Sequence, residues 1–90
     1  MREKTLHRSK KLKQNSDACS LILYNDNFNT FDHVIKSLVE VCGHDYIQAE
    51  QCALIVHNHG SYAVKIGSKV ILNAMRRALS SKGLNSKVLS

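Results

Sequence analysis

The chain has 90 residues, of which 43% are hydrophobic, and it carries a formal net charge of +6. This length supports one domain with a small core and excludes several domains that each bury a core of their own. No apolar run approaches the roughly 20 residues that cross a bilayer, and no apolar segment follows the basic N-terminus as in a signal peptide, so we expect a cytoplasmic protein without membrane contact.

The positive charge is concentrated at the start of the chain. Residues 1–17 contain six basic and two acidic side chains, whereas the rest of the chain contains seven and five. After Met1, the only large apolar residues in this segment are Leu6 and Leu12, which bury too little surface to offset the entropy of ordering. We therefore expect residues 1–19 to be a flexible basic extension and residues 20–90 to be the domain.

The three cysteines are Cys19, Cys42 and Cys52. An odd number without paired metal-type spacing does not make a disulfide framework or a structural metal site. Reduced thiols fit a reducing compartment, and we expect no metal and no other cofactor.

The first predicted element is a short buried strand, because the apolar run Leu21–Tyr24 is followed by the turn-forming group Asn25–Asn27. Asn29 is well placed to cap a helix that ends at Gly43. Apolar residues recur in this helix at intervals of three and four and predict one buried face. They are Phe31, Val34, Ile35, Leu38, Val39 and Cys42.

A second helix is predicted to begin at Asp45, because Gln48 three residues later resembles a capping box. Its apolar stripe is Ala49, Cys52, Ala53 and Val56. Gly60 supplies the left-handed conformation that commonly closes a helix. The two helices should form a hairpin.

The remaining elements are a strand, a helix and a last edge strand. Tyr62, Val64 and Ile66 alternate with smaller or polar residues, and a helical stripe follows Ser68. The members of that stripe are Val70, Ile71, Ala74, Met75, Ala78 and Leu79. Beyond Gly83, weak alternation over residues 84–88 predicts an edge strand. The expected fold is a single small α+β domain in the order β-α-α-β-α-β, with a three-stranded antiparallel sheet packed against three helices.

Two constellations suggest chemistry but are better explained as parts of the fold. His57 and His59 lie near Cys52, yet a metal site needs three or four convergent ligands. Cys52 and His57 are five residues apart on one helix, so the thiol and the imidazole do not face each other directly. An enzyme that uses Cys52 or His57 is therefore the third hypothesis for this chain.

Basic residues on and after the third helix could contact phosphate. A few basic residues on an amphipathic helix usually form only its solvated side, however. The residues concerned are Lys69, Arg76, Arg77, Lys82 and Lys87. A small basic nucleic-acid or ribosome-associated module remains the main alternative function.

The segment Leu21–Val34, which reads LILYNDNFNTFDHV, resembles the ClpS family, whose first strand ends in a similar Asn-Asp pair before a helix. The resemblance continues through Ala49-Glu50-Gln51 to Val56-His57 and then Gly60. It covers about residues 20–66. The separation of the two motifs by a helix hairpin of matching length argues against chance similarity.

This resemblance implies a bacterial, non-enzymatic adaptor that binds proteins by their N-terminal residue and delivers them to a Clp protease. The family positions that bind the free α-amino group match Asn25, Asp26 and His57. These residue types suit an α-ammonium, because a carboxylate balances its charge while an amide oxygen and an unprotonated imidazole nitrogen accept its hydrogen bonds.

The family positions that line the apolar part of the pocket match Asn29, Phe31, Val34, Ala53 and Val56. Four residues, at three places in the chain, depart from the family pattern. Ala53 stands where many relatives have Met, Asn29-Thr30 replaces a common Thr-Pro helix start, and Asn27 stands where a second acidic residue is frequent.

The resemblance also implies two kinds of partner. One is the N-terminal domain of a Clp AAA+ unfoldase, and the other is a protein or peptide with N-terminal Leu, Phe, Tyr or Trp. It implies neither a nucleic acid nor a membrane. The extension of residues 1–19 resembles the family segment that reaches toward the unfoldase pore.

Overall fold

The computed structural model describes residues 18–90, and its elements follow the predicted order. They are β1 (Ala18–Tyr24), α2 (Phe31–Cys42), α3 (Tyr46–His59), β2 (Ser61–Ser68), α4 (Lys69–Ser81) and β3 (Ser86–Leu89). The predicted flexible extension lies outside the described residues except for Ala18 and Cys19. These two residues begin β1, where Ala18 pairs with Ser68 and the Cys19 side chain is buried.

The sheet has three antiparallel strands in the order β2-β1-β3, so the predicted last strand is an edge strand. Burial alternates along the central strand: Cys19, Leu21 and Leu23 are buried, whereas the intervening side chains are half-buried. The expected apolar run is therefore covered by helices on one face only. A register shift between Leu21 and Ile22 marks an irregularity in the β1–β2 pairing.

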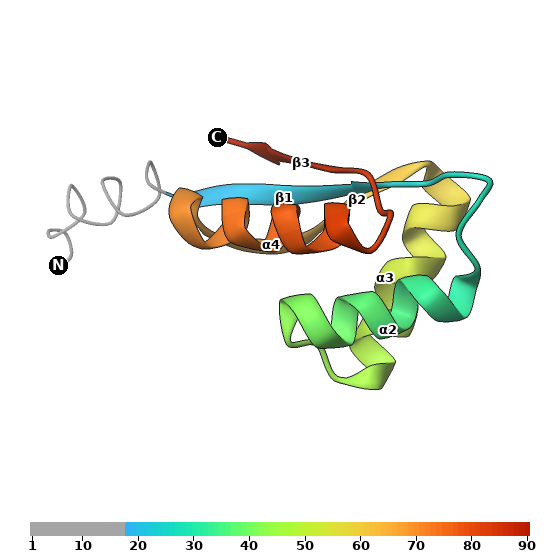
Figure 1. Cartoon of the computed structure of the whole chain (residues 1–90). Helices are drawn as coiled ribbons and strands as arrows, with labels where there is room; N and C mark the ends of the chain where they lie inside the picture. Colours follow the sequence, from blue (N-terminus) through green and yellow to red (C-terminus); the bar gives the residue numbers. More distant parts are fainter. Residues whose placement is uncertain (1–17) are drawn as a thin grey trace, which may run out of the picture.

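The α2–α3 hairpin forms as predicted and lies at the end of the sheet where β1 leads into its loop (Figure 1). Gly43 and Gly60 close the two helices with φ of 73° and 90°, a left-handed conformation that glycine adopts without steric cost. Asp45 caps α3, since its Oδ1 accepts from Gln48 N at 2.7 Å. All four residues of the predicted α3 stripe are buried.

The predicted cap of α2 is wrong. Thr30, not Asn29, is the N-cap, and Thr30 Oγ1 accepts from His33 N at 3.1 Å. The Asn29 side chain is directed elsewhere, since its Nδ2 donates to Asp26 Oδ2 and to the Gly83 carbonyl oxygen.

Helix α4 runs alongside β1 and β2 (Figure 1), but its buried face differs from the predicted stripe. Val70 and Ile71 are 80% and 56% exposed, while Leu72 and Leu79 are fully buried and Met75 packs against the core. Leu72 packs at Gly67 of β2, where an added Cβ would lie 3.7 Å from Leu72 Cδ2. This contact with the sheet sets the rotation of α4, and local spacing does not report it.

The core lies between the sheet and the helices, with Leu21, Leu23, Ile35, Leu38, Leu72 and Leu79 as its most completely buried large apolar residues. Within the part of the chain that the structure describes, no helix is long and apolar enough to cross a membrane.

Candidate functional site

A cavity of about 280 Å³ lies where the loop after β1, the start of α2, the last two turns of α3 and the α4–β3 turn meet. All eight residues that the sequence assigned to a binding site line this cavity: Asn25, Asp26, Asn29, Phe31, Val34, Ala53, Val56 and His57. The fold thus brings together residues from two segments of the chain. Their roles in binding stay predictions.

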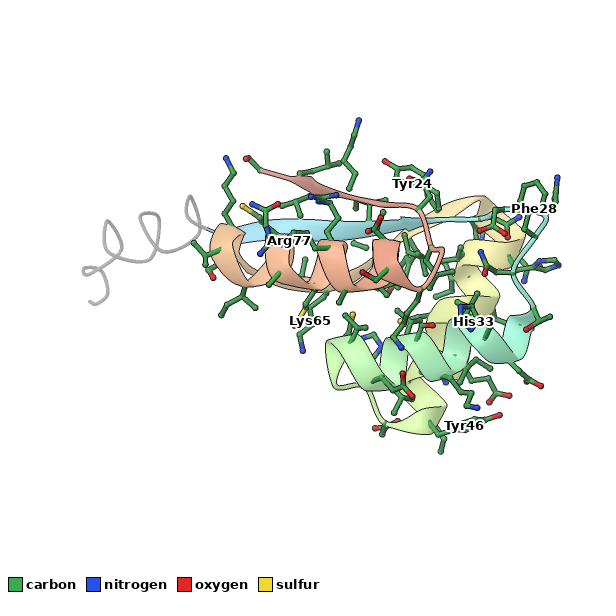
Figure 2. The ribbon with its side chains drawn as sticks, in the orientation of Figure 1. Tyr24, Phe28, His33, Tyr46, Lys65 and Arg77 are labelled. Atoms are coloured by element: carbon green, nitrogen blue, oxygen red, sulfur yellow. The ribbon has the colours of Figure 1, made fainter. Side chains whose placement is uncertain are left out.

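The loop residues at the polar end of the cavity are held by the Asp26 carboxylate. Asp26 Oδ1 accepts from the backbone N–H groups of Phe28 and Asn29, both at 2.8 Å. Its Oδ2 accepts from Asn29 Nδ2 at 2.8 Å. These bonds fix the loop so that Asn27 and Asn29 line the cavity, whereas Phe28 is 93% exposed at the outer edge of the loop (Figure 2).

The Asp26 carboxylate remains able to bind a cation. The backbone N–H of Asn29 is the main cause that lowers the pKa of Asp26 below its usual value of 3.8, with further contributions from the Asn29 amide and the Phe28 N–H. The group is therefore ionised at neutral pH. Each carboxylate oxygen has two lone pairs, so Oδ2, which accepts one bond within the protein, keeps an acceptor position.

Asn25 and His57 lie on the two sides of the same opening. The backbone N–H of Asn25 donates to the Gly60 carbonyl oxygen at 2.9 Å, which ties the loop to the end of α3. His57 lies in the last turn of α3, where the helix dipole places partial negative charge. Both side chains are exposed, and neither makes a hydrogen bond to another of residues 18–90, so both are available to a ligand.

The apolar end of the cavity is formed by Phe31 and Val34 of α2 and by Ala53 and Val56 of α3. Ala53 and Val56 are 3% and 4% exposed, while Phe31 is 40% exposed. The hairpin places these four side chains on facing surfaces because each lies on the stripe of its own helix. Ala53 has the smallest side chain of the four.

Sequence reasoning missed three residues that line the cavity, which are Leu23, Tyr24 and Leu84, and it noted Asn27 only as a departure from the family pattern. Leu23 and Tyr24 were predicted only as strand residues, although their position before Asn25 could have indicated the cavity. Leu84 follows the Gly83 turn, far along the chain, and no local signal connects it to this site. It is 4% exposed and belongs to the core as well as to the cavity wall.

Asn29 has a more polar role than a residue that only lines an apolar pocket. Its Nδ2 donates to Asp26 Oδ2 at 2.8 Å and to the Gly83 carbonyl oxygen at 3.0 Å. It therefore joins the polar end of the cavity to the α4–β3 turn.

The thiols of Cys42 and Cys52 do not line this cavity. Cys52 is 7% exposed and burial raises the pKa of its thiol, so the reactive thiolate is scarce at neutral pH. Burial also raises the pKa of Cys42 to about 11. Within residues 18–90, no three His, Cys, Asp or Glu side chains gather closely enough to hold a metal ion.

Comparison with known proteins agrees with this architecture. The family model described as "ATP-dependent Clp protease adaptor protein ClpS" matches residues 14–87, which is most of the chain and extends beyond the segment that carried the resemblance. The chain belongs to the ClpS family. No curated protein matches its sequence.

Among solved structures, the fold is similar to Agrobacterium tumefaciens ClpS2 bound to L-phenylalaninamide. The TM-score is 0.77, the sequences are 17% identical, and the match covers 80% of this chain and 94% of the ClpS2 chain. At this identity the likeness establishes the ClpS fold alone. Family membership makes the chain a Clp protease adaptor by class, and the family is not one of catalytic enzymes.

Proposed function

We propose that this ClpS-family protein binds proteins that carry a bulky apolar N-terminal residue and delivers them to a Clp protease. The observation that carries the proposal is that one cavity has a carboxylate at one end and apolar side chains at the other. Asp26 is the only carboxylate among its lining residues, and none of them is a lysine or arginine. A cationic group attached directly to an apolar group matches this arrangement.

The α-amino end of a polypeptide is such a group. Its ammonium has three N–H donors and one positive charge, and the free position on Asp26 Oδ2 would accept one of these donors. The Asn25 amide oxygen and an unprotonated His57 nitrogen would accept the others. The carbonyl groups at the end of α3 add partial negative charge on the same side.

The first side chain would then enter the space between Phe31, Val34, Ala53 and Val56. The volume of about 280 Å³ lies just below the usual range of roughly 300–1,000 Å³ for sites that hold whole small molecules, and it suits one residue. N-terminal Leu, Phe, Tyr and Trp are the expected ligands. The ligand in the ClpS2 structure, L-phenylalaninamide, has the same combination of a free α-amino group and a large apolar side chain.

Delivery would use two further parts of the protein. The folded domain would dock on the N-terminal domain of a Clp AAA+ unfoldase in the bacterial cytoplasm, and the residues before β1 would act as the extension that engages this partner. Deleting residues 2–17 should leave peptide binding unchanged because the cavity is built from residues 23–84. The same deletion should impair degradation of a bound substrate, and unimpaired degradation would contradict a role for the extension.

The proposed specificity is tested with a series of fluorescent peptides that differ only in their first residue, covering all twenty amino acids. Fluorescence anisotropy should show tight binding for Leu, Phe, Tyr and Trp and weak binding for Asp, Glu, Lys and Gly. Affinity that does not depend on the first residue would overturn the proposal. A nucleic-acid module would instead bind DNA or RNA with a steep salt dependence.

A further inference from the structure

The Asn29 side chain bridges two parts of the cavity wall. Asn29 Nδ2 carries two hydrogens, and the structure uses both: one bond goes to Asp26 Oδ2 at 2.8 Å and the other to the Gly83 carbonyl oxygen at 3.0 Å. Asp26 lies three residues from Asn29 in the sequence, whereas Gly83 lies 54 residues away. The Asn29 amide therefore connects the loop after β1 to the distant α4–β3 turn.

That turn forms part of the cavity wall. Leu84, which follows Gly83, is 4% exposed and lines the cavity beside the apolar residues of α2 and α3. Gly83 has a φ of 83°, and the Leu84 N–H donates to the Leu79 carbonyl oxygen at 3.0 Å. The direction of the chain at Gly83 thus determines where the Leu84 side chain lies.

A second contact from α2 holds the residue before Gly83. His33 Nε2 donates to the Lys82 carbonyl oxygen at 2.8 Å, and His33 lies on α2 just after the loop (Figure 2). Consecutive carbonyl groups of the turn therefore bond to Asn29 and His33. Both anchors lie in the segment that carries Asp26, so these two bonds tie the turn to the polar end of the cavity.

We propose that Asn29 is a positioning residue that couples the two halves of N-terminal recognition. One N–H of its amide orients the Asp26 carboxylate that would receive the ammonium, and the other fixes the turn that places Leu84 against the first side chain. The consequence for binding rests on the function proposed above. The coupling itself is a property of the free protein.

The chemistry of the side chain explains why Asn is suited to this role. Threonine is common at the matching position of the family pattern. Its hydroxyl has a single O–H donor and can serve only one of the two acceptors. An aspartate has no donor and would place negative charge against the Asp26 carboxylate and the Gly83 carbonyl oxygen. The Asn29 side chain also contributes to the lowered pKa of Asp26, next to the larger effect of the Asn29 backbone N–H, and the electrostatic effect of the neighbouring His33 side chain acts in the same direction.

The coupling is tested first without any ligand. In the full-length protein, Asn29→Thr should raise the titration midpoint of the Asp26 carboxyl carbon and shift the Leu84 methyl signals in NMR spectra. Asn29→Ser is the second variant if Asn29→Thr unfolds. Asn85→Ala is the matched control, because Asn85 lies two residues beyond Gly83, is exposed, and makes no side-chain hydrogen bond to another of residues 18–90.

The control should change neither signal. If Asn29→Thr shifts the Asp26 titration but leaves the Leu84 methyl groups unchanged, Asn29 acts on the carboxylate alone and the coupling is wrong. If neither signal changes in a folded variant, Asn29 has no positioning role.

Peptide binding then tests the consequence. Two ratios of Kd are compared, one for N-acetylated against free Leu peptides and one for Ala against Leu at the first position. In Asn29→Thr both ratios should fall, by about tenfold each, as expected for loss of a hydrogen bond to a charged group and of the wall that it holds. A fall in the acetylation ratio alone would overturn the coupling. If the wild-type protein binds none of these peptides, the proposed function fails. The ligand-free NMR measurement then still decides whether Asn29 couples Asp26 to Leu84.

Discussion

Replacing Asp26 by Asn and by Ala separates its effect on the ligand from its effect on the loop. Asp26 accepts three hydrogen bonds within the protein, two at Oδ1 and one at Oδ2. Asp26→Ala removes all three bonds and the charge. Asp26→Asn keeps the shape and the oxygen that accepts from Phe28 and Asn29 N–H, but it removes the charge and turns an amide donor toward Asn29 Nδ2.

The expected losses follow from these contacts. A partly exposed hydrogen bond contributes about 1 kcal/mol, so Asp26→Ala should lower the free energy of unfolding by about 2 to 3 kcal/mol and Asp26→Asn by about 1 kcal/mol. For binding, each variant leaves the ammonium without its opposite charge. Both should therefore lose about 2 to 4 kcal/mol of binding free energy, the range for truncating one partner of a desolvated charge pair.

Isothermal titration calorimetry with a free N-terminal Leu peptide measures the binding loss, and urea unfolding measures the stability loss. The reasoning predicts that the two variants differ in stability and agree in binding. If Asp26→Asn is folded and binds as tightly as the wild-type protein, the carboxylate does not receive the ammonium. If only Asp26→Ala loses binding, Asp26 acts through the loop.

Two further predictions concern buried residues. Ala53 is 3% exposed in the cavity wall, so Ala53→Met should fill the space beside it and weaken binding of N-terminal Ile and Val by about 1 to 3 kcal/mol relative to Leu and Phe, because branching at Cβ places bulk near the entrance. Equal losses in peptide titrations with all four residues would indicate general packing, and no loss would show that Ala53 does not contact the ligand. His44 is 4% exposed, its Nε2 donates to the Val64 carbonyl oxygen at 2.8 Å, and its buried Nδ1 has no hydrogen-bond partner in residues 18–90. Burial lowers the pKa of His44 below 6.5, so the contribution of neutral His44 to stability is complete above pH 6.5. At lower pH the free energy of unfolding falls by up to about 1.4 kcal/mol per pH unit, until His44 is protonated in the folded protein as well. His44→Gln keeps an N–H donor without a titrating ring and should remove this part of the pH dependence in urea unfolding; an identical pH profile for both proteins would contradict it.

The sequence predicts well those features that depend on neighbouring residues. Asp45 with Gln48, and the glycines at 43 and 60, mark helix ends because the groups that bond or turn there lie within one helical turn. The α3 stripe is similarly local, and the whole order of elements follows from such signals. The eight candidate site residues came from a family resemblance, which relates segments that spacing alone does not connect.

Features that depend on distant contacts were predicted less well. The rotation of α4 depends on Leu72 packing at Gly67, and the role of Asn29 depends on a carbonyl group 54 residues away. Leu84 lines the cavity because of the same turn. Predicting these three features requires the tertiary structure. The local sequence pattern is nearly the same whichever face of α4 is buried and whether or not Asn29 caps α2.

The most direct test of the proposed function compares a peptide that begins with free Leu with its N-acetylated form. Acetylation leaves the Leu side chain intact but removes the positive charge and two of the donors that Asp26, Asn25 and His57 would receive. Calorimetry should show tight binding of the free peptide and a loss of at least about 2 kcal/mol on acetylation, a factor of about 30 in Kd. Equal affinity for the two peptides would contradict recognition of the α-amino group by this cavity.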